Sequence, residues 1–258
     1  MIAPSAALTA SPGSKVPLTF ACGLYDRVLR LYTGEIQPQG IDLKFIVNDE
    51  PREIFDRMAG ELAYDLSELS ASEYISRLGN NQCPFIALPV FASRVFRHGF
   101  IFLNAAKNIR KPSDLVGKKV GLRNFQATAN LWIRGILEHE YQLLHRSIQW
   151  FKQDEEEVEW TPPSGLNIQR VAAGKNVEQM LVEGELDALI HPEVIQPILN
   201  KDQRVSRLFP AYRELEIEYF KRTGIFPIMH TTAIKQEVVE KYPWVPINLM
   251  QAFEDSKR

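Results

Sequence analysis

Two arginines and a histidine stand close together in the chain, between two apolar segments. Arg94, Arg97 and His98 lie between residues 85–91 and 99–104, which both have the apolar pattern of buried strands. Arginine holds carboxylates through paired, charge-assisted hydrogen bonds, and histidine donates or accepts a proton near neutral pH. This spacing predicts an anion-binding site at which a proton is moved. Ion pairs at a strand end and a structural histidine are the alternatives.

The charges around this motif favour the same interpretation. Residues 94–137 contain nine Lys or Arg side chains and one acid, Asp114, whereas the net charge of the whole chain is −2. A cationic patch on a mildly acidic protein suits a small anionic ligand better than a polyanion. A solvated basic face is the alternative that composition leaves open.

Polar side chains also stand at the end of the strand that we predict over residues 64–69. The hydroxyls of Ser67 and Ser70 can donate hydrogen bonds to the oxygens of an acid, and the carboxylate of Glu68 can move a proton. Helix capping is the alternative, because Ser70 or Ser72 preceding Glu73 resembles a capping arrangement.

Two other strand-to-helix turns carry polar side chains that can face a ligand. Asp26 and Arg27 begin a predicted helix soon after the first strand, and Arg123 and Thr128 stand on either side of the turn before the predicted helix 128–144. A helix N-terminus attracts anions. The alternatives are dipole complementarity for the aspartate and simple capping for the threonine.

Histidines at two further strand positions complete the set of candidate substrate-binding residues. His191 ends a predicted strand just before Pro192, and His230 lies on a later strand. Together with His98 and Glu68 they are also the candidates for a metal site. No two of them have the local spacing of a ligand pair, so we predict no metal and no other cofactor.

Composition sets limits on the class of protein. The 258 residues are 45% hydrophobic, which is enough for one large domain or two lobes, and the pI near 6.2 argues against nucleic-acid binding. No apolar run approaches the ~20 residues of a membrane span. Residues 1–16 lack the apolar core of a signal peptide, so we expect a disordered leader. Two cysteines are too few for a disulfide framework, which favours the cytoplasm.

Strand and helix patterns alternate along the chain, which is typical of an α/β fold. No nucleotide-binding, zinc-protease or nucleophile-elbow motif is present. Strands are predicted over residues 16–22, 41–47, 64–69, 85–91, 99–104, 119–123, 148–152, 188–191, 206–209 and 226–231. Helices are predicted over residues 25–31, 51–58, 71–78, 112–116, 128–144, 177–183, 194–200, 214–223 and from 239 onward, with a surface loop over 154–163.

Several of these segments, in this order, resemble the 4,5-dihydroxyphthalate decarboxylase family, which has a type 2 periplasmic-binding-protein-like fold. The most specific are the R-x-F-R-H motif at Arg94–His98 and the S-E-L-S motif at Ser67–Ser70. Family members usually continue beyond residue 258, so this chain resembles a C-terminally short member. The matching segments are LYDRVLRL (24–31), IQPQGIDLKF (36–45), DEPREIFDRM (49–58), YDLSELSASEYI (64–75), FIALPVFASRVFRHGFIFLN (85–104), DLVGKKVGL (114–122) and TANLWIRGILEHEY (128–141).

The resemblance implies two α/β lobes with a cleft between them. Lobe one is then residues 17–98 plus 231–258, C-terminally incomplete, and lobe two is residues 99–230. Ligands of such folds bind in the inter-lobe cleft, at strand C-termini and helix N-termini.

The resemblance also implies a carboxy-lyase that converts 4,5-dihydroxyphthalate into protocatechuate and carbon dioxide. Arg94 and Arg97 would hold the carboxylate that remains, and either Glu68 or His98 would ionise the phenol while the other protonates carbon. The partner is then a small aromatic carboxylate, and we also allow for a homo-oligomer. The alternative is a non-catalytic solute-binding protein or sensor for a small organic acid. A third hypothesis, that the chain binds or synthesises a pyrimidine precursor like other proteins of the same fold group, has no supporting motif in the sequence.

Overall fold

The computed structural model describes residues 14–258, so the predicted leader lies outside the described residues as far as position 13. Ser14 and Lys15 lead into the first strand, which begins at Val16. The chain divides into two compact units. Among the described residues, unit 1 comprises 14–69, 84–92 and 231–258, and unit 2 comprises 70–83 and 93–230.

These units differ from the predicted lobes in two segments. Residues 70–83 belong to unit 2 because their first turn is hydrogen-bonded to Thr128. Residues 93–98 belong to it as well, because Arg97 is bonded to Pro192 and Met229. Whether the two units act as lobes around a cleft stays a prediction.

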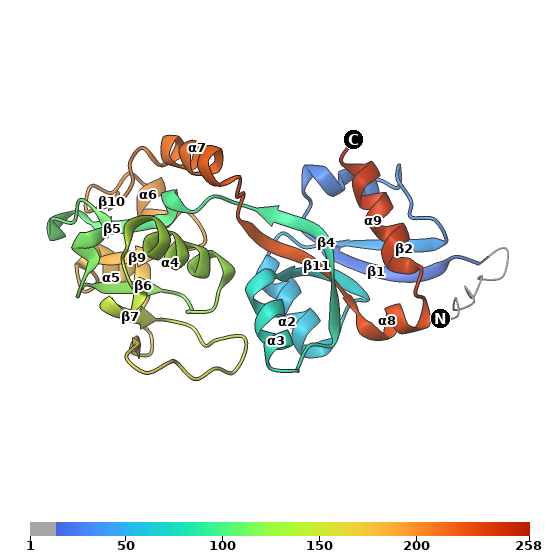
Figure 1. Cartoon of the computed structure of the whole chain (residues 1–258), viewed down its shortest axis with the longest axis horizontal. Helices are drawn as coiled ribbons and strands as arrows, with labels where there is room; N and C mark the ends of the chain where they lie inside the picture. Colours follow the sequence, from blue (N-terminus) through green and yellow to red (C-terminus); the bar gives the residue numbers. More distant parts are fainter. Residues whose placement is uncertain (1–13) are drawn as a thin grey trace. The chain divides into compact units, whose positions relative to one another are not determined.

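The sheet of unit 1 has the strand order β2-β1-β3-β11-β4, and β4 and β11 both continue into unit 2 (Figure 1). β1 is parallel to β2 and to β3. Parallel neighbours bring their carboxyl ends to the same edge of a sheet, which therefore gathers the polar residues that follow these strands. The bounds are Val16–Cys22 for β1, Ile41–Val47 for β2, Leu66–Ser70 for β3, Phe85–Arg94 for β4 and Ile228–Lys235 for β11.

Helices pack on this sheet through apolar side chains. The ring of Phe20 in β1 meets that of Phe253 edge to face, with centroids 5.3 Å apart, and this contact anchors the last helix of the chain. Edge-to-face aromatic pairs add to the free energy gained by burial. The helices of unit 1 are α1 (Leu29–Tyr32, preceded by a 3-10 turn at Asp26–Val28), α2 (Pro51–Glu61), α8 (Gln236–Lys241) and α9 (Val245–Ser256).

The sheet of unit 2 has the order β10-β5-β9-β6-β7-β8. β6 is parallel to β7 and β9, whereas β5 is antiparallel to β9 and β10. The mixture of directions is common in large α/β sheets. The bounds are Ile101–Asn104 for β5, Lys119–Leu122 for β6, Gln149–Lys152 for β7, Asn167–Arg170 for β8, Ala188–Ile190 for β9 and Val205–Arg207 for β10.

A second apolar core lies between this sheet and its helices. Trp150 of β7 is completely buried there, with Ile133 and Leu137 of the long helix in the same cluster. The apolar stripe that predicted this helix is therefore the face that it buries. The helices of unit 2 are α3 (Ala71–Gly79), α4 (Thr128–Tyr141), α5 (Val177–Glu183), α6 (Gln196–Leu199) and α7 (Tyr212–Thr223), with 3-10 turns at His98–Phe100, Ala105–Lys107, Pro112–Leu115 and His145–Ser147.

The predicted elements differ from the observed ones mainly at their ends. β4 continues past residue 91 to Arg94 because it pairs with β11. The strand predicted from residue 99 begins only at Ile101, since the preceding 3-10 turn packs on α7. A Cβ on Gly99 would lie 2.7 Å from the Tyr212 ring, which explains why glycine stands in this close contact.

Three other differences have local causes. The helix from Thr128 ends at Tyr141, because Gln142 takes a left-handed conformation with φ 56°. The final helical segment is two helices, since Pro243 follows α8 and has no N–H to continue it. β8 was not predicted because its residues are mostly exposed and lack an apolar pattern.

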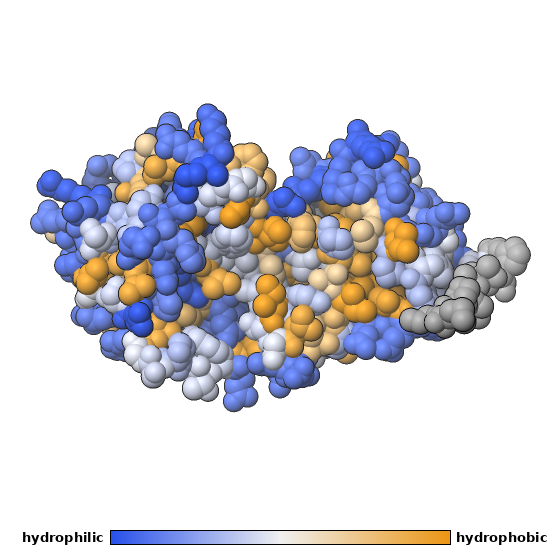
Figure 2. Space-filling model, viewed as in Figure 1, coloured by the Kyte–Doolittle hydropathy of each residue, from blue (hydrophilic) through white to orange (hydrophobic). Residues whose placement is uncertain are grey.

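The surface in Figure 2 shows hydrophilic residues with apolar residues among them, as is usual for folded proteins. Among residues 14–258, none of the helices combines the length and apolar character that crossing a bilayer requires.

Candidate functional site

Glu68 of β3 is the acceptor of a buried hydrogen-bond cluster in unit 1. Its Oε2 accepts from the backbone N–H of Gly23 at 3.2 Å and from the thiol of Cys22 at 3.5 Å. Its Oε1 accepts from the hydroxyl of Tyr25 at 2.7 Å. We call Cys22, Gly23, Tyr25 and Glu68 the Glu68 cluster. It forms because β1 and β3 are parallel neighbours that pair Ala21 with Ser67, so their carboxyl ends coincide.

The electrostatics of the cluster keep its donors protonated. Burial, reinforced by the nearby Glu68 carboxylate, raises the pKa of the Cys22 thiol well above its usual value. The same two causes, in the same order, raise the pKa of Tyr25 far above its usual value. Glu68 itself is 0% exposed. At neutral pH the tyrosine and the cysteine therefore stay protonated and donate to the oxygens of Glu68.

Arg27 holds the tyrosine ring of this cluster in place. Its guanidinium lies 4.3 Å from the centroid of the Tyr25 ring, a cation–π contact. It donates to the carbonyl oxygen of Ala92 and pairs with the carboxylate of Asp26 at 3.2 Å. The Asp26 side chain is almost fully exposed. Ser67, next to Glu68, donates its hydroxyl to the carbonyl oxygen of Glu68 at 2.9 Å.

Three hydroxyls meet at two helix N-termini in unit 2, and we call Ser70, Ser72 and Thr128 the hydroxyl cluster. Thr128, the first residue of α4, has its Oγ1 2.9 Å from the Ser70 hydroxyl and 2.8 Å from the Ser72 hydroxyl. Ser70 directly precedes α3. All three residues are buried. Because helix N-termini carry partial positive charge, this arrangement suits a carboxylate.

Arg97 is a buried cation without a carboxylate partner among the described residues. Its Nη1 donates to the carbonyl oxygen of Pro192 at 2.6 Å, and its Nε lies 3.0 Å from the sulfur of Met229. The guanidinium also lies 4.9 Å from the centroid of the Phe100 ring. Burial lowers the pKa of Arg97 to about 10, so it remains charged at neutral pH. A buried guanidinium in this state fits the binding of an anion. Arg94, at the end of β4, is exposed.

His98 lies in the interior of unit 2, close to α7. Its ring meets those of Phe209 and Tyr219 edge to face, and its side chain is 3% exposed. Its Nδ1 has no hydrogen-bond partner among the described residues and is 4.0 Å from the carboxylate of Glu216. Burial lowers the pKa of His98, which favours the neutral ring. Glu216 is held in turn by the N–H of Gly99 at 3.3 Å.

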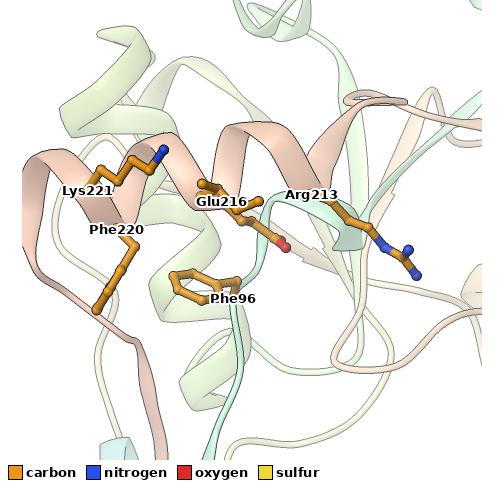
Figure 3. A pocket seen from close by; sticks show the side chains of 6 residues that line it. Phe96, Arg213, Glu216, Phe220 and Lys221 are labelled. Carbon is orange, nitrogen blue, oxygen red and sulfur yellow. The ribbon is translucent and has the colours of Figure 1, made fainter.

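Glu216 also lines a hollow of about 560 Å³. Figure 3 shows Phe96 facing Phe220 across it, with Arg213 pointing away. The Phe96 ring also stacks on Phe226, with centroids 4.7 Å apart. The hollow is mainly apolar, and Glu216 is what links it to the predicted site residue His98.

The remaining predicted residues have separate surroundings. Arg123 is exposed and pairs with Asp154 at 2.8 Å. His191, directly after β9, is buried, and its Nδ1 accepts from the N–H of Glu193 at 3.1 Å. Burial lowers the pKa of His191. His230 is half-buried in β11.

The structure thus brings the predicted residues into three groups. Glu68 shares a cluster with the turn that carries Asp26 and Arg27, and Ser70 meets Thr128. Arg97 reaches the carbonyl of Pro192, directly after His191. Among the described residues there is no group of three His, Cys, Asp or Glu side chains placed to hold a metal ion.

Four members of these groups are not among the predicted site residues: Cys22, Gly23 and Tyr25 of the Glu68 cluster and Ser72 of the hydroxyl cluster. The sequence pattern places Tyr25 at the start of a predicted helix, and its position three residues after β1 is the signal that it can reach the end of the strand. Ser72 was considered only for capping. Its spacing of two from Ser70 was the available signal, since both lie at the predicted start of a helix.

Two curated proteins are similar to this chain over most of its length. The chain is 36% identical over 250 residues to the 4,5-dihydroxyphthalate decarboxylase of Comamonas testosteroni, covering 95% of this chain and 76% of that protein. It is 34% identical over 202 residues to the 4,5-dihydroxyphthalate decarboxylase of Pseudomonas putida, covering 76% of this chain and 78% of that protein. No model of a known protein family matches the chain.

Solved structures with a similar fold include two sulfonate-binding proteins. The periplasmic aliphatic sulphonate binding protein SsuA of Escherichia coli has a TM-score of 0.57 at 11% identity, over 95% of this chain and 73% of that one. The alkanesulfonate-binding protein SsuA of Xanthomonas axonopodis pv. citri, bound to MOPS, has a TM-score of 0.53 at 10% identity, over 95% and 74%. Such identities establish the fold alone, the α/β fold of type 2 periplasmic binding proteins. On the similarity to the two curated proteins, this chain belongs to the 4,5-dihydroxyphthalate decarboxylase family.

Proposed function

We propose that this chain is a carboxy-lyase that converts 4,5-dihydroxyphthalate into protocatechuate and carbon dioxide. The observation that carries the proposal is the 36% identity over 250 residues to a curated decarboxylase of that substrate. The Glu68 cluster and the buried cation Arg97 supply groups that suit this chemistry.

The reaction needs one proton removed and one proton added. Each carboxylate of the substrate lies para to a ring hydroxyl, so ionising that hydroxyl pushes electron density to the carbon that bears the carboxylate. A proton then adds to this carbon, the bond to the carboxylate breaks, and carbon dioxide leaves with the ring restored. No oxidant or reductant is required. Transfer of a proton by a positioned side chain typically contributes ~10²–10⁴-fold to the rate.

We assign the removal of the phenol proton to Glu68, whose carboxylate accepts hydrogen bonds from proton donors. We assign carboxylate binding to Arg97 and to the hydroxyl cluster. Arg97 offers a charged donor with no carboxylate partner among the described residues, and the hydroxyl cluster lies at the N-termini of α3 and α4. Arg94, Arg123, His191 and His230 stay predicted contributors to binding.

Protonation of the ring carbon remains assigned to His98 as a prediction. Its lowered pKa leaves it neutral at pH 7, and its ring is enclosed by Phe209 and Tyr219. It can therefore act on a substrate only after the side chains around it move. Glu216, 4.0 Å from its Nδ1, is the nearby acid that could return a proton to it.

A solute-binding protein or sensor is the second candidate. The fold is shared with the sulfonate-binding proteins, and the hydroxyl cluster suits an acid that is bound without turnover. We also propose a cytoplasmic location, because two cysteines are too few for a disulfide framework and therefore favour a reducing compartment. A homo-oligomer stays a prediction.

Product detection separates the two candidates. Purified protein is incubated with 4,5-dihydroxyphthalate, and protocatechuate and carbon dioxide are measured. Phthalate, which lacks the ring hydroxyls, is the control that can bind but cannot react by this route. Both products should form from the hydroxylated acid only. Thermal stabilisation by both acids without any product would instead favour the solute-binding protein.

A further inference from the structure

The carboxylate of Glu68 is too enclosed to touch a substrate. The residue is 0% exposed, and its two oxygens already accept hydrogen bonds within unit 1 from Cys22, Gly23 and Tyr25. If Glu68 takes the phenol proton, as proposed above, the proton must reach it through one of its neighbours.

Of the three donors within unit 1, only Tyr25 has both an exchangeable hydroxyl proton and exposed surface. Cys22 is completely buried, and the N–H of Gly23 is a backbone amide of a buried residue. Tyr25 is half-buried, and its hydroxyl has the shortest contact with Glu68, at 2.7 Å. This distance is within the ordinary range for an O–H···O hydrogen bond, and a proton acceptor within hydrogen-bond reach is what proton transfer requires.

The ring of Tyr25 is held in position by contacts on two sides. Arg27 lies over one face, and its own guanidinium is fixed by Asp26 and by the carbonyl of Ala92. On the backbone side, a Cβ on Gly23 would lie 3.2 Å from two ring carbons and 3.3 Å from the hydroxyl oxygen of Tyr25. Glycine at position 23 therefore leaves room for the phenol to reach Glu68.

We propose that Tyr25 is a catalytic residue that passes the phenol proton of the substrate to Glu68. The substrate O–H bond breaks as its proton joins the Tyr25 oxygen, and the Tyr25 proton joins Oε1 of Glu68. The negative charge thereby moves from the carboxylate to the substrate phenolate, and Tyr25 is neutral before and after. This inference rests on the proposed decarboxylase function.

A concerted transfer fits the electrostatics of the cluster. Burial and the charge of Glu68 raise the pKa of Tyr25, so a free tyrosinate here is strongly disfavoured. Simultaneous transfer avoids that state, because the tyrosine oxygen gains one proton as it loses the other.

The test compares Tyr25→Phe with Tyr32→Phe, an exposed tyrosine of α1 outside the cluster. Turnover of 4,5-dihydroxyphthalate to protocatechuate is measured from pH 5 to 9, with circular dichroism to follow folding. Tyr25→Phe should lower kcat by about 10²–10⁴-fold with KM changed by less than about threefold, and Tyr32→Phe should behave like the wild type.

Fluorinated tyrosines at position 25 keep the ring and its hydroxyl while making the phenol more acidic. Across such a series kcat should change steadily with phenol acidity, which a purely structural tyrosine would not produce. A folded Tyr25→Phe variant with wild-type kcat, or a fluorinated series with constant kcat, overturns the role of Tyr25 alone. If Tyr25→Phe does not fold, the fluorinated series decides. Absence of protocatechuate from the wild type overturns the decarboxylase function together with this proposal.

Discussion

The hydroxyl oxygen of Thr128, at the start of α4, accepts a hydrogen bond from the backbone N–H of Ser72, in the first turn of α3, at 3.0 Å. One side chain thus satisfies a free N–H of another helix and ties the two helix N-termini together. The four first N–H groups of a helix have no partner within the helix, so such a contact has a stabilising effect.

Thr128→Val is expected to destabilise the protein, although valine has nearly the same side-chain shape as threonine. The valine leaves the Ser72 N–H without its acceptor in a buried place, which costs about 1–3 kcal/mol in the free energy of unfolding. Denaturant unfolding measures this, and Thr128→Ser, which keeps the hydroxyl, is the control. If the hydroxyl cluster also binds a carboxylate, KM should rise in the valine variant. Equal stability of the valine and serine variants would contradict the structural role.

Arg97→Met should weaken substrate binding without destabilising the fold. A buried cation with no carboxylate partner among the described residues contributes little to stability, because no ion pair offsets the free energy that its removal from water costs. Loss of a charge-assisted hydrogen bond to a carboxylate costs about 1.5–3 kcal/mol, so KM should rise roughly 10- to 150-fold. Steady-state kinetics and thermal unfolding give both quantities.

Arg146→Met, at an exposed arginine outside the candidate site, is the matched control and should leave KM unchanged. An Arg97→Met variant with unchanged KM and a lower melting temperature would show that Arg97 is structural.

Glu68→Gln should lower kcat with little change in KM. The amide can still accept hydrogen bonds through its oxygen but cannot take up a proton, so we expect a loss of about 10²–10⁴-fold in kcat. Glu61→Gln, at an exposed acid at the end of α2, is the control. Turnover of the Glu68 variant at the wild-type rate would exclude Glu68 as the proton acceptor.

Stability should fall when the pH drops below about 6.5, the ordinary pKa of histidine. Burial lowers the pKa of His98 and of His191 in the folded chain, so below that pH the unfolded chain binds protons that the folded chain does not. As the pH falls, the free energy of unfolding therefore decreases until the pH has passed below the pKa of these histidines in the folded chain. Above their pKa in the unfolded chain, this contribution to stability is fully present.

His98→Phe should flatten this pH dependence, since phenylalanine can pack against Phe209 and Tyr219 without binding a proton. Urea unfolding at several pH values between 5 and 8 measures the slope, with His139→Gln at an exposed position as the control. A slope that His98→Phe leaves unaltered would mean that other groups cause the acid sensitivity. Burial raises the pKa of Glu216, which acts in the opposite direction at lower pH.

The local sequence was enough to predict most elements of this fold and to identify its family. β1 and β2 have the predicted bounds, because their alternating apolar residues need no distant partner to be recognised. The long apolar stripe of α4 predicted the helix in the same way, and only its C-terminal end required the left-handed Gln142. The motif at Arg94–His98 identified a chemically unusual segment without showing which side chain is buried.

The tertiary structure alone decided which polar groups meet. Glu68 meets Cys22 across 46 residues of chain, Thr128 meets Ser72 across 56, and Arg97 meets Pro192 across 95. These contacts depend on strand order and helix packing, which local patterns do not encode, since the same strand could pair with several neighbours. The sequence therefore indicates which residue types can bind an anion. Only the tertiary structure places Tyr25 beside Glu68 and buries His98 against α7, because both contacts depend on how distant segments pack.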